Sequence, residues 1–105
     1  MRYGLRQGDI DEILHVLGQF PQIDEAMVFG SRAKGNFKPG SDVDIAIKGP
    51  AIDQSCVAGL SFFLNEETSL PYFFDIVHYE EITEQELARH IDRVGKVFYQ
   101  RKASP

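Results

Sequence analysis

The stretch AMVFGSRAKGNFKPGSDVDIAI, residues 26–47, determines the fold that we predict for this chain. It begins with four apolar residues, 26–29, and ends with an alternating run, 42–48, in which β-branched residues take every second position. Gly30 and the turn residues Pro39-Gly40 separate the two runs. Short apolar or alternating runs bounded by such residues are typical of β-strands. The stretch therefore predicts two strands, joined by a short helix that begins at Gly30 and by a loop.

The flanking sequence alternates between helical and strand-like segments. Apolar residues recur at helical spacing in three segments, and two shorter apolar or aromatic runs predict further strands. We expect helices over about residues 9–20, 53–66 and 83–94, and strands over about 72–78 and 97–99. Asp9, Asp53 and Thr83 stand where helix N-caps are expected. This order predicts an α/β (α+β) fold with a small mixed sheet and with helices mainly on one face.

The bulk composition is that of a small soluble protein. Its 105 residues have room for a single domain, residues 1–105, and 43% hydrophobic with 26% charged residues is typical of a folded chain. No apolar run approaches the roughly 20 residues of a membrane helix. The first residues lack the apolar stretch of a signal peptide. We therefore expect a cytoplasmic protein with no membrane partner.

The charge balance argues against a long nucleic acid as partner. The formal net charge is −5, and the basic residues do not form a run. Proteins that bind a long stretch of nucleic acid usually present a basic face, because phosphate neutralisation supplies most of the affinity. A single nucleotide held together with metal ions remains compatible with this balance.

Asp42 and Asp44 form a candidate metal site. They are two residues apart in a predicted strand, so both carboxylates project from the same face. Two such charges raise each other's pKa unless a cation binds between them. Oxygen ligands without His or Cys nearby favour Mg²⁺, or Mn²⁺, over zinc. Taken alone, the pair is equally compatible with a solvated strand end after a turn.

Asp75 supplies a third carboxylate. It lies within residues 72–77, a run of aromatic and β-branched residues in which a buried charge is costly unless it is paired or bound to a metal. A metal site shared with Asp42 and Asp44 on an adjacent strand would account for this charge. A salt bridge to an arginine is the structural alternative.

Residues 30–34 carry groups suited to phosphate. Gly30 lets the backbone approach a ligand closely, and N–H groups at the start of a helix favour anions. The Ser31 hydroxyl can bond a phosphate oxygen, and Arg32 and Lys34 can balance its charge. A strand that ends in Gly-Ser is also a common turn, so these residues point to phosphate only in combination with the carboxylates.

In combination, these residues resemble a known signature. Gly30-Ser31, ten intervening residues and Asp42-Val43-Asp44 resemble the signature of the DNA polymerase β-like nucleotidyltransferase superfamily. The amino-acid sequence of residues 30–35 and 41–47 is similar to the corresponding motifs of its minimal nucleotidyltransferase (MNT) branch. Asp75 falls where that family carries its third carboxylate, and residues 95–99 look like the family's end. The resemblance implies the nucleotidyltransferase, or polymerase β palm-like, fold.

The resemblance also implies a mechanism. Asp42, Asp44 and Asp75 would be the catalytic residues and the ligands of Mg²⁺, with Mn²⁺ as a substitute, in a displacement at the α-phosphorus of ATP or another nucleoside triphosphate. Asp75 would also stand where the attacking hydroxyl loses its proton. The residues expected to bind the nucleotide are Gly30, Ser31, Arg32 and Lys34.

The acceptor is expected on a second protein. Larger relatives hold it with an added helical domain, for which 105 residues leave no room. If Asp75 faces the site, Phe73 shares that face uncovered, which suggests a lid or partner, unless a loop or the base covers it. Minimal nucleotidyltransferases are commonly paired with helical HEPN toxins. The resemblance implies that this chain, as antitoxin in an oligomer with such a partner, transfers AMP from ATP to a toxin tyrosine.

Two other functions remain open at this stage. One is a nucleotidyltransferase for a small molecule of the aminoglycoside type, which needs an acceptor cavity that a chain of this length hardly provides. The other is a non-catalytic nucleotide-binding module that neutralises its partner by contact. No residue pattern in the sequence distinguishes ATP from the other nucleoside triphosphates; only the preference of the family that it resembles points to ATP.

Overall fold

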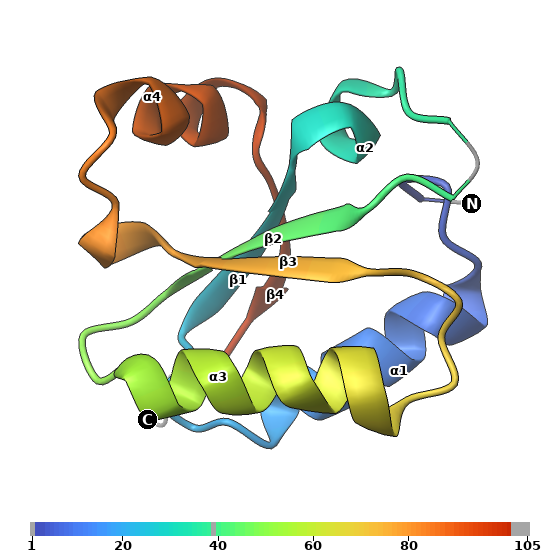
Figure 1. Cartoon of the computed structure of the whole chain (residues 1–105), viewed down its shortest axis with the longest axis horizontal. Helices are drawn as coiled ribbons and strands as arrows, with labels where there is room; N and C mark the ends of the chain where they lie inside the picture. Colours follow the sequence, from blue (N-terminus) through green and yellow to red (C-terminus); the bar gives the residue numbers. More distant parts are fainter. Residues whose placement is uncertain (1, 39, 102–105) are drawn as a thin grey trace.

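Helices and strands follow the predicted order. The structure, a computed structural model, describes residues 2–38 and 40–101. Its elements (Figure 1) are α1 (Gln7–Gly18), β1 (Glu25–Phe29), α2 (Gly30–Lys34), β2 (Val43–Lys48), α3 (Gln54–Phe62), the π-helical turn η1 (Phe63–Glu67), β3 (Phe74–His78), the 3₁₀ turn η2 (Tyr79–Glu81), α4 (Gln85–Val94) and β4 (Lys96–Gln100). Of the predicted turn, Pro39 lies outside the described residues, while Gly40 has the positive φ of +83° that such a turn needs. Each described helix is too short or too polar to cross a membrane.

The four strands form the mixed sheet that was predicted. Their order is β3-β2-β1-β4, so β3 and β4 are its edges among the described strands. β1 is antiparallel to both β2 and β4, whereas β2 and β3 are parallel. The parallel pair needs a crossover connection, which α3 provides.

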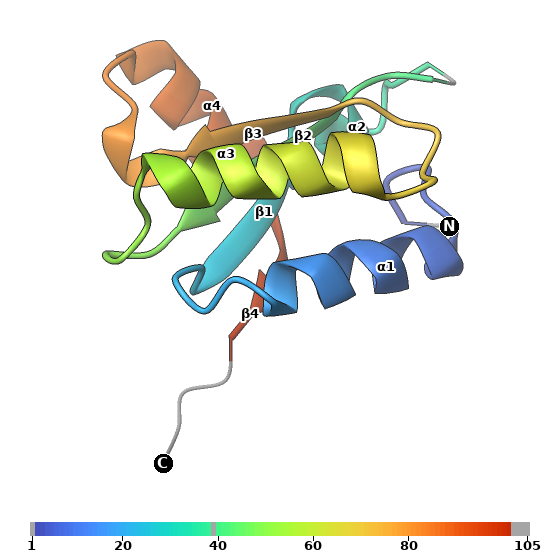
Figure 2. The ribbon, with the colours of Figure 1, turned by 60° about the horizontal axis from the view of Figure 1, so that its bottom comes forward.

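The two faces of the sheet are covered to different extents. α1 and α3 form the larger helical layer on one face (Figure 2), where Val43, Ile45 and Ile47 of β2 are fully buried. Each of these side chains contributes about 1.5–3 kcal/mol by leaving water. On the opposite face Ile91 of α4 packs in a smaller cluster with Ala46 of β2. The helices therefore lie mainly, but not wholly, on one face, and the alternation predicted for β2 is confirmed.

Helix starts agree only in part with the predicted caps. Asp53 caps α3 by accepting a hydrogen bond from the Cys56 amide at 2.8 Å. Asp9 is the third residue of α1 instead of its cap, and accepts from the Arg6 amide at 3.3 Å. Thr83 does not cap α4, which begins two residues later with no side-chain cap. The sequence pattern therefore predicted the three helices, but it located the N-cap residue correctly only for α3.

Candidate functional site

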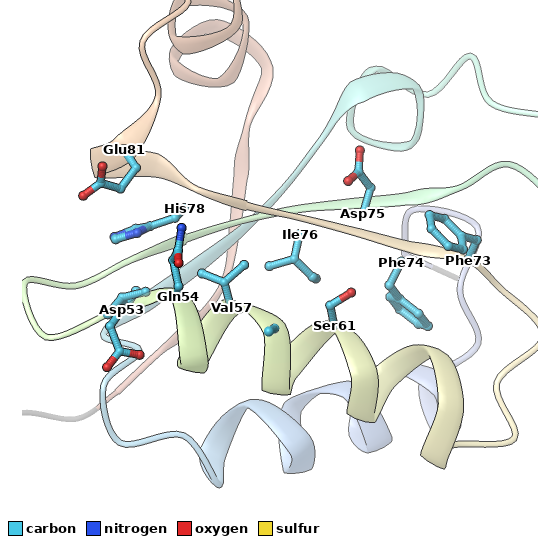
Figure 3. Close-up of a pocket in the computed structure, with 12 residues that line it drawn as sticks. Asp53, Gln54, Val57, Ser61, Phe73, Phe74, Asp75, Ile76, His78 and Glu81 are labelled. Carbon is cyan, nitrogen blue, oxygen red and sulfur yellow. The ribbon is translucent and has the colours of Figure 1, made fainter.

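Asp44 and Asp75 lie opposite each other on neighbouring strands. In the parallel pairing of β2 with β3 they are direct register partners, so their Cα atoms are about one interstrand spacing apart, roughly 5 Å. Both lie on the face opposite α1 and α3, and Figure 3 shows the Asp75 carboxylate directed away from α3. Asp42 immediately precedes β2. The fold thus brings all three predicted carboxylates to one region of the sheet.

Asp44 carries the electrostatic strain of this cluster. Its carboxyl is half-buried and its pKa is raised to about 6, first because burial removes water from the ionised form, then because Asp75 and Asp42 add like charge. The Arg32 guanidinium acts in the opposite direction on this pKa. The rise in pKa that clustered carboxylates are expected to cause in one another is therefore present at Asp44.

The expectation that Asp75 is a buried charge is wrong. Its side chain is exposed, because β3 is an edge strand with a neighbouring strand on one side. The alternation around it is as predicted: Phe74 is completely buried toward the helices, whereas Phe73 is 58% exposed beside the carboxylates. The residue for which ionisation is costly is Asp44, and Asp75 contributes to that cost through its charge.

Basic side chains do not neutralise the cluster. The ion pairs among the described residues are Arg6–Asp9, Lys48–Glu25, His78–Glu80 and Arg101–Asp24. The arginine salt bridge considered for Asp75 is therefore not formed. An all-carboxylate donor set fits Mg²⁺ or Mn²⁺. Among the described side chains, no three His, Cys, Asp or Glu groups are gathered closely enough to hold one ion, and Mg²⁺ in proteins is commonly held by one or two carboxylates together with phosphate oxygens and water.

Gly30 is required by its contact with Asp44. Its φ is +71°, in the left-handed region that favours glycine. A Cβ built on Gly30 would overlap Oδ2 of Asp44. This proximity follows from the sheet, since Phe29, the preceding residue, is the register partner of Asp44 in β1. The first turn of α2 is thereby held directly against the carboxylate.

Ser31 and Lys34 lie on α2, beside this contact. Ser31 is half-buried in the first turn of the helix, and Lys34 is exposed at its last residue. Gly35, the residue that follows α2, has a φ of +87° and closes the helix in the left-handed conformation. Binding of a triphosphate by Gly30, Ser31 and Lys34 stays a prediction.

Arg32 makes structural hydrogen bonds that the local sequence did not indicate. It is 3% exposed, and its guanidinium donates to the Ser41 carbonyl at 2.8 and 3.1 Å and to the Tyr3 carbonyl at 2.8 Å. The rings of Phe37 and Tyr72 lie 5.0 and 5.1 Å from its central carbon, within the range of cation–π contacts. These contacts favour a role in anchoring the loop before Asp42 over the direct phosphate contact that we expected.

A groove lies between α3 and the open edge of β3 (Figure 3), with a volume of about 770 Å³. Its apolar and small residues include Val57, Ala58, Ser61 and Ile76, and its charged or titratable residues are Asp53, Asp75, His78 and Glu81. Asp75 contributes to the lining, and its carboxylate is directed to the other face of β3, so the groove and the carboxylate cluster lie on the two sides of this strand. No local sequence pattern predicted the groove itself, whereas the exposed Phe73 at its rim agrees with the expectation.

Comparison with known proteins agrees with the fold. The profile of a nucleotidyltransferase family, polymerase beta, matches residues 11–104, which include Asp42, Asp44 and Asp75. The mixed sheet together with this family match defines a nucleotidyltransferase domain. The chain belongs to the polymerase beta nucleotidyltransferase family. A search of curated protein sequences finds no match.

Solved structures share the fold over most of the chain. A chain in a toxin–antitoxin complex with AMP-PNP superposes with a TM-score of 0.73 at 22% identity, covering 90% of this chain and 75% of that one. A complex of a tri-AMPylated Shewanella oneidensis HEPN toxin with its MNT antitoxin gives 0.69 at 20% identity, covering 92% and 74%. The toxin–antitoxin pair MntA–HepT gives 0.69 at 20%, covering 91% and 74%. These similarities confirm the predicted nucleotidyltransferase fold.

Proposed function

We propose that this nucleotidyltransferase uses Mg²⁺ to transfer AMP from ATP to a tyrosine hydroxyl of a HEPN-type helical partner, and thereby acts as the antitoxin of a toxin–antitoxin pair. One observation carries the proposal. Asp44 is half-buried beside Asp75 and Asp42, and its pKa is raised to about 6 by burial and by their charges. Such an arrangement is costly in the free protein and becomes favourable when a hard cation binds.

Asp42 and Asp44 are the residues that would hold Mg²⁺, and Asp75 would complete the site. The bound ion would supply neutralisation of the charge that develops on the triphosphate during an in-line displacement. The acceptor oxygen forms a bond to the α-phosphorus, the bond from that phosphorus to the bridging oxygen breaks, and pyrophosphate leaves. Asp75, which is exposed at the sheet edge, is suited to accept the hydroxyl proton of an incoming acceptor.

The nucleotide would lie along the start of α2. The Ser31 hydroxyl and the backbone of residues 30–31 would bond the β- and γ-phosphates, and exposed Lys34 would balance their charge. Arg32 contributes indirectly, because its bonds to the Ser41 carbonyl fix the chain immediately before Asp42. ATP as donor agrees with AMP-PNP in a structurally similar complex, and we expect the protein to act in the cytoplasm.

A protein acceptor is supported by two features. The uncovered Phe73 and the groove beside Asp75 leave apolar surface next to the reacting groups, and such surface commonly marks a binding site. Structurally similar chains occur in complexes of a HEPN toxin with an MNT antitoxin, one with the toxin tri-AMPylated. A hydroxyl acceptor delivered by a second protein accounts for both features.

Neutralisation by contact alone is the second candidate. It is favoured by one observation: among the described side chains, the three carboxylates are not gathered at metal-ligand distance. In that case the protein would bind its partner without modifying it. Transfer to a small molecule has no comparable support in the structure.

The test is the intact mass of the partner after incubation with this protein, ATP and Mg²⁺, followed by peptide mapping. The partner for this test is sought among the products of neighbouring genes, as a small HEPN-type helical protein. The proposal predicts a mass increase of one or more AMP groups on tyrosine, which disappears with Asp44→Asn or with EDTA. A stable complex of unmodified mass would support the contact mechanism, and modification of an added aminoglycoside would support the small-molecule function.

A further inference from the structure

The open edge of β3 has the features of a strand-binding site. β3 pairs only with β2 among the described strands. The Val43 amide donates to the Phe73 carbonyl at 2.9 Å, and in a parallel ladder alternate residues direct both backbone groups to the same neighbour. Phe73 and Asp75 therefore pair with β2, whereas Phe74 and Ile76 direct their N–H and C=O groups toward the groove.

The outward backbone groups of Phe74 are already hydrogen-bonded, by a side chain that takes the place of a neighbouring strand. The Asn65 side chain accepts from the Phe74 amide at 2.8 Å and donates to the Phe74 carbonyl at 3.0 Å, as a neighbouring peptide group would. The next outward residue, Ile76, has no strand of the described chain beside it. The edge is thus covered at one end and open where the groove lies.

From this arrangement we propose that the acceptor protein binds as an extended, basic segment that adds a strand to the open edge of β3 and places its hydroxyl next to Asp75. The proposal rests on the function proposed above and specifies how the acceptor reaches the site. Addition of a strand to a sheet edge is a common mode of peptide recognition, in which main-chain bonds give affinity and alternate side chains give specificity.

The alternation of side chains explains why this edge suits the reaction. In an added strand, the residue opposite Asp75 directs its side chain to the face that carries Asp75 and Asp44, away from α3. The residues on either side of it point into the groove, toward Val57, Ala58 and Ser61. In one alignment of the added strand with β3, the residue opposite Asp75 therefore brings its hydroxyl to the carboxylates. The residues before and after it in the added strand then place their side chains in the groove.

The charge of the groove indicates the nature of the segment. Two acids, Asp53 and Glu81, line it together with His78, the one basic-type side chain among the lining residues, and the Asp75 carboxylate lies on the opposite face of β3. Lys or Arg in the segment would be attracted to this groove. A second copy of this chain is a poor occupant, because its net charge is −5 and both edges would bring carboxylates together.

Two readouts with the HEPN-type partner test the site. Hydrogen exchange of the wild-type complex should slow at the Ile76 amide by roughly tenfold or more, because an added strand bonds it. Ala58→Trp, at an exposed groove position on α3, should raise the KM for the partner roughly tenfold and leave the KM for ATP unchanged. Ser55→Trp is the matched control, since Ser55 is exposed on the same helix and does not line the groove.

The outcomes separate this proposal from the proposed function. AMP transfer that is equally efficient in Ala58→Trp and wild type, with no protection at Ile76, would overturn the docking site and leave the transferase function standing. Protection at Ile76 without transfer would support the docking site and overturn AMP transfer. Protection that arises in this protein alone and grows with its concentration would identify a second copy as the occupant. Absence of any complex would overturn both proposals.

Discussion

Asp44 of β2 and Asp75 of β3 are register partners in the parallel pairing of the sheet, and this places two carboxylates side by side on the face not covered by α1 and α3. The pair differs in environment, because Asp44 is half-buried and Asp75 is exposed. Under the proposed function, the inner carboxylate would bind the metal and the outer one would contact both the metal and the acceptor.

Asp44→Asn should stabilise the metal-free protein. At neutral pH the substitution removes a partly buried charge next to two others, so the free energy of unfolding should rise by on the order of 1 kcal/mol after allowance for partial exposure. It should also abolish most of the rise in Tm that Mg²⁺ with ATP produces in the wild type. Thermal melts with EDTA and with Mg²⁺–ATP measure both effects, and exposed Glu67→Gln is the control. A Tm rise that survives in Asp44→Asn would contradict the metal assignment.

The stability of the metal-free protein should fall as the pH rises from about 4 to about 6. The pKa of Asp44 is about 6 in the fold, above its ordinary value of 3.8, so in this interval the folded state binds more protons than the unfolded state. Mg²⁺ needs the ionised carboxylate, and its stabilising effect should therefore weaken below pH 6. The difference between wild type and Asp44→Asn, measured by denaturant unfolding across this range, isolates the effect. A difference independent of pH would contradict it.

Gly30→Ala should cost more than Gly35→Ala, although both glycines have positive φ, +71° and +87°. The strain of a left-handed residue costs about 1–3 kcal/mol at either position. Only at Gly30 would the new Cβ also strike Asp44, since a Cβ at Gly35 meets nothing within 4 Å. Gly30→Ala should thus lose Mg²⁺–ATP binding, while Gly35→Ala should lose stability alone. Unfolding and nucleotide titration of both variants measure the contrast, and equal loss of binding would refute the role of the Gly30–Asp44 contact.

Much of the fold followed from local sequence, because period and turn residues are local properties. Alternation in β2 identified the face of Asp44, and Asp53 was correctly placed as a cap. The exposure of Asp75 was not predictable in this way, since the position of β3 at the sheet edge depends on strand order. The groove likewise forms only when α3 packs beside that edge.

Arg32 illustrates the same limit at the level of one side chain. Its sequence context, Gly30-Ser31-Arg32, suggested a phosphate contact. Its partners are the carbonyls of Tyr3 and Ser41, 29 and 9 residues away, which no local pattern reveals. Such buried, charge-assisted bonds can be recognised only once the chain is folded.

Arg32→Lys should therefore impair the fold and the reaction together. Lysine cannot reproduce a forked set of bonds to two carbonyls, so the free energy of unfolding should fall by about 2–4 kcal/mol. Displacement of the loop before Asp42 should lower kcat. By contrast, exposed Lys34→Gln should leave stability unchanged and raise the KM for ATP. Chemical denaturation and transfer kinetics compare the two, and a purely ATP-specific defect in Arg32→Lys would restore the original phosphate role.

The most direct measurement uses ATP labelled either at the α- or at the γ-phosphorus, with the HEPN-type partner and Mg²⁺. We predict that the α-label becomes attached to the partner, that the γ-label is released in pyrophosphate, and that Asp44→Asn and Asp75→Asn each reduce the transfer by at least roughly a hundredfold. Label from the γ-position on the partner, or a stable complex that carries no label, would contradict nucleotidyl transfer by this site.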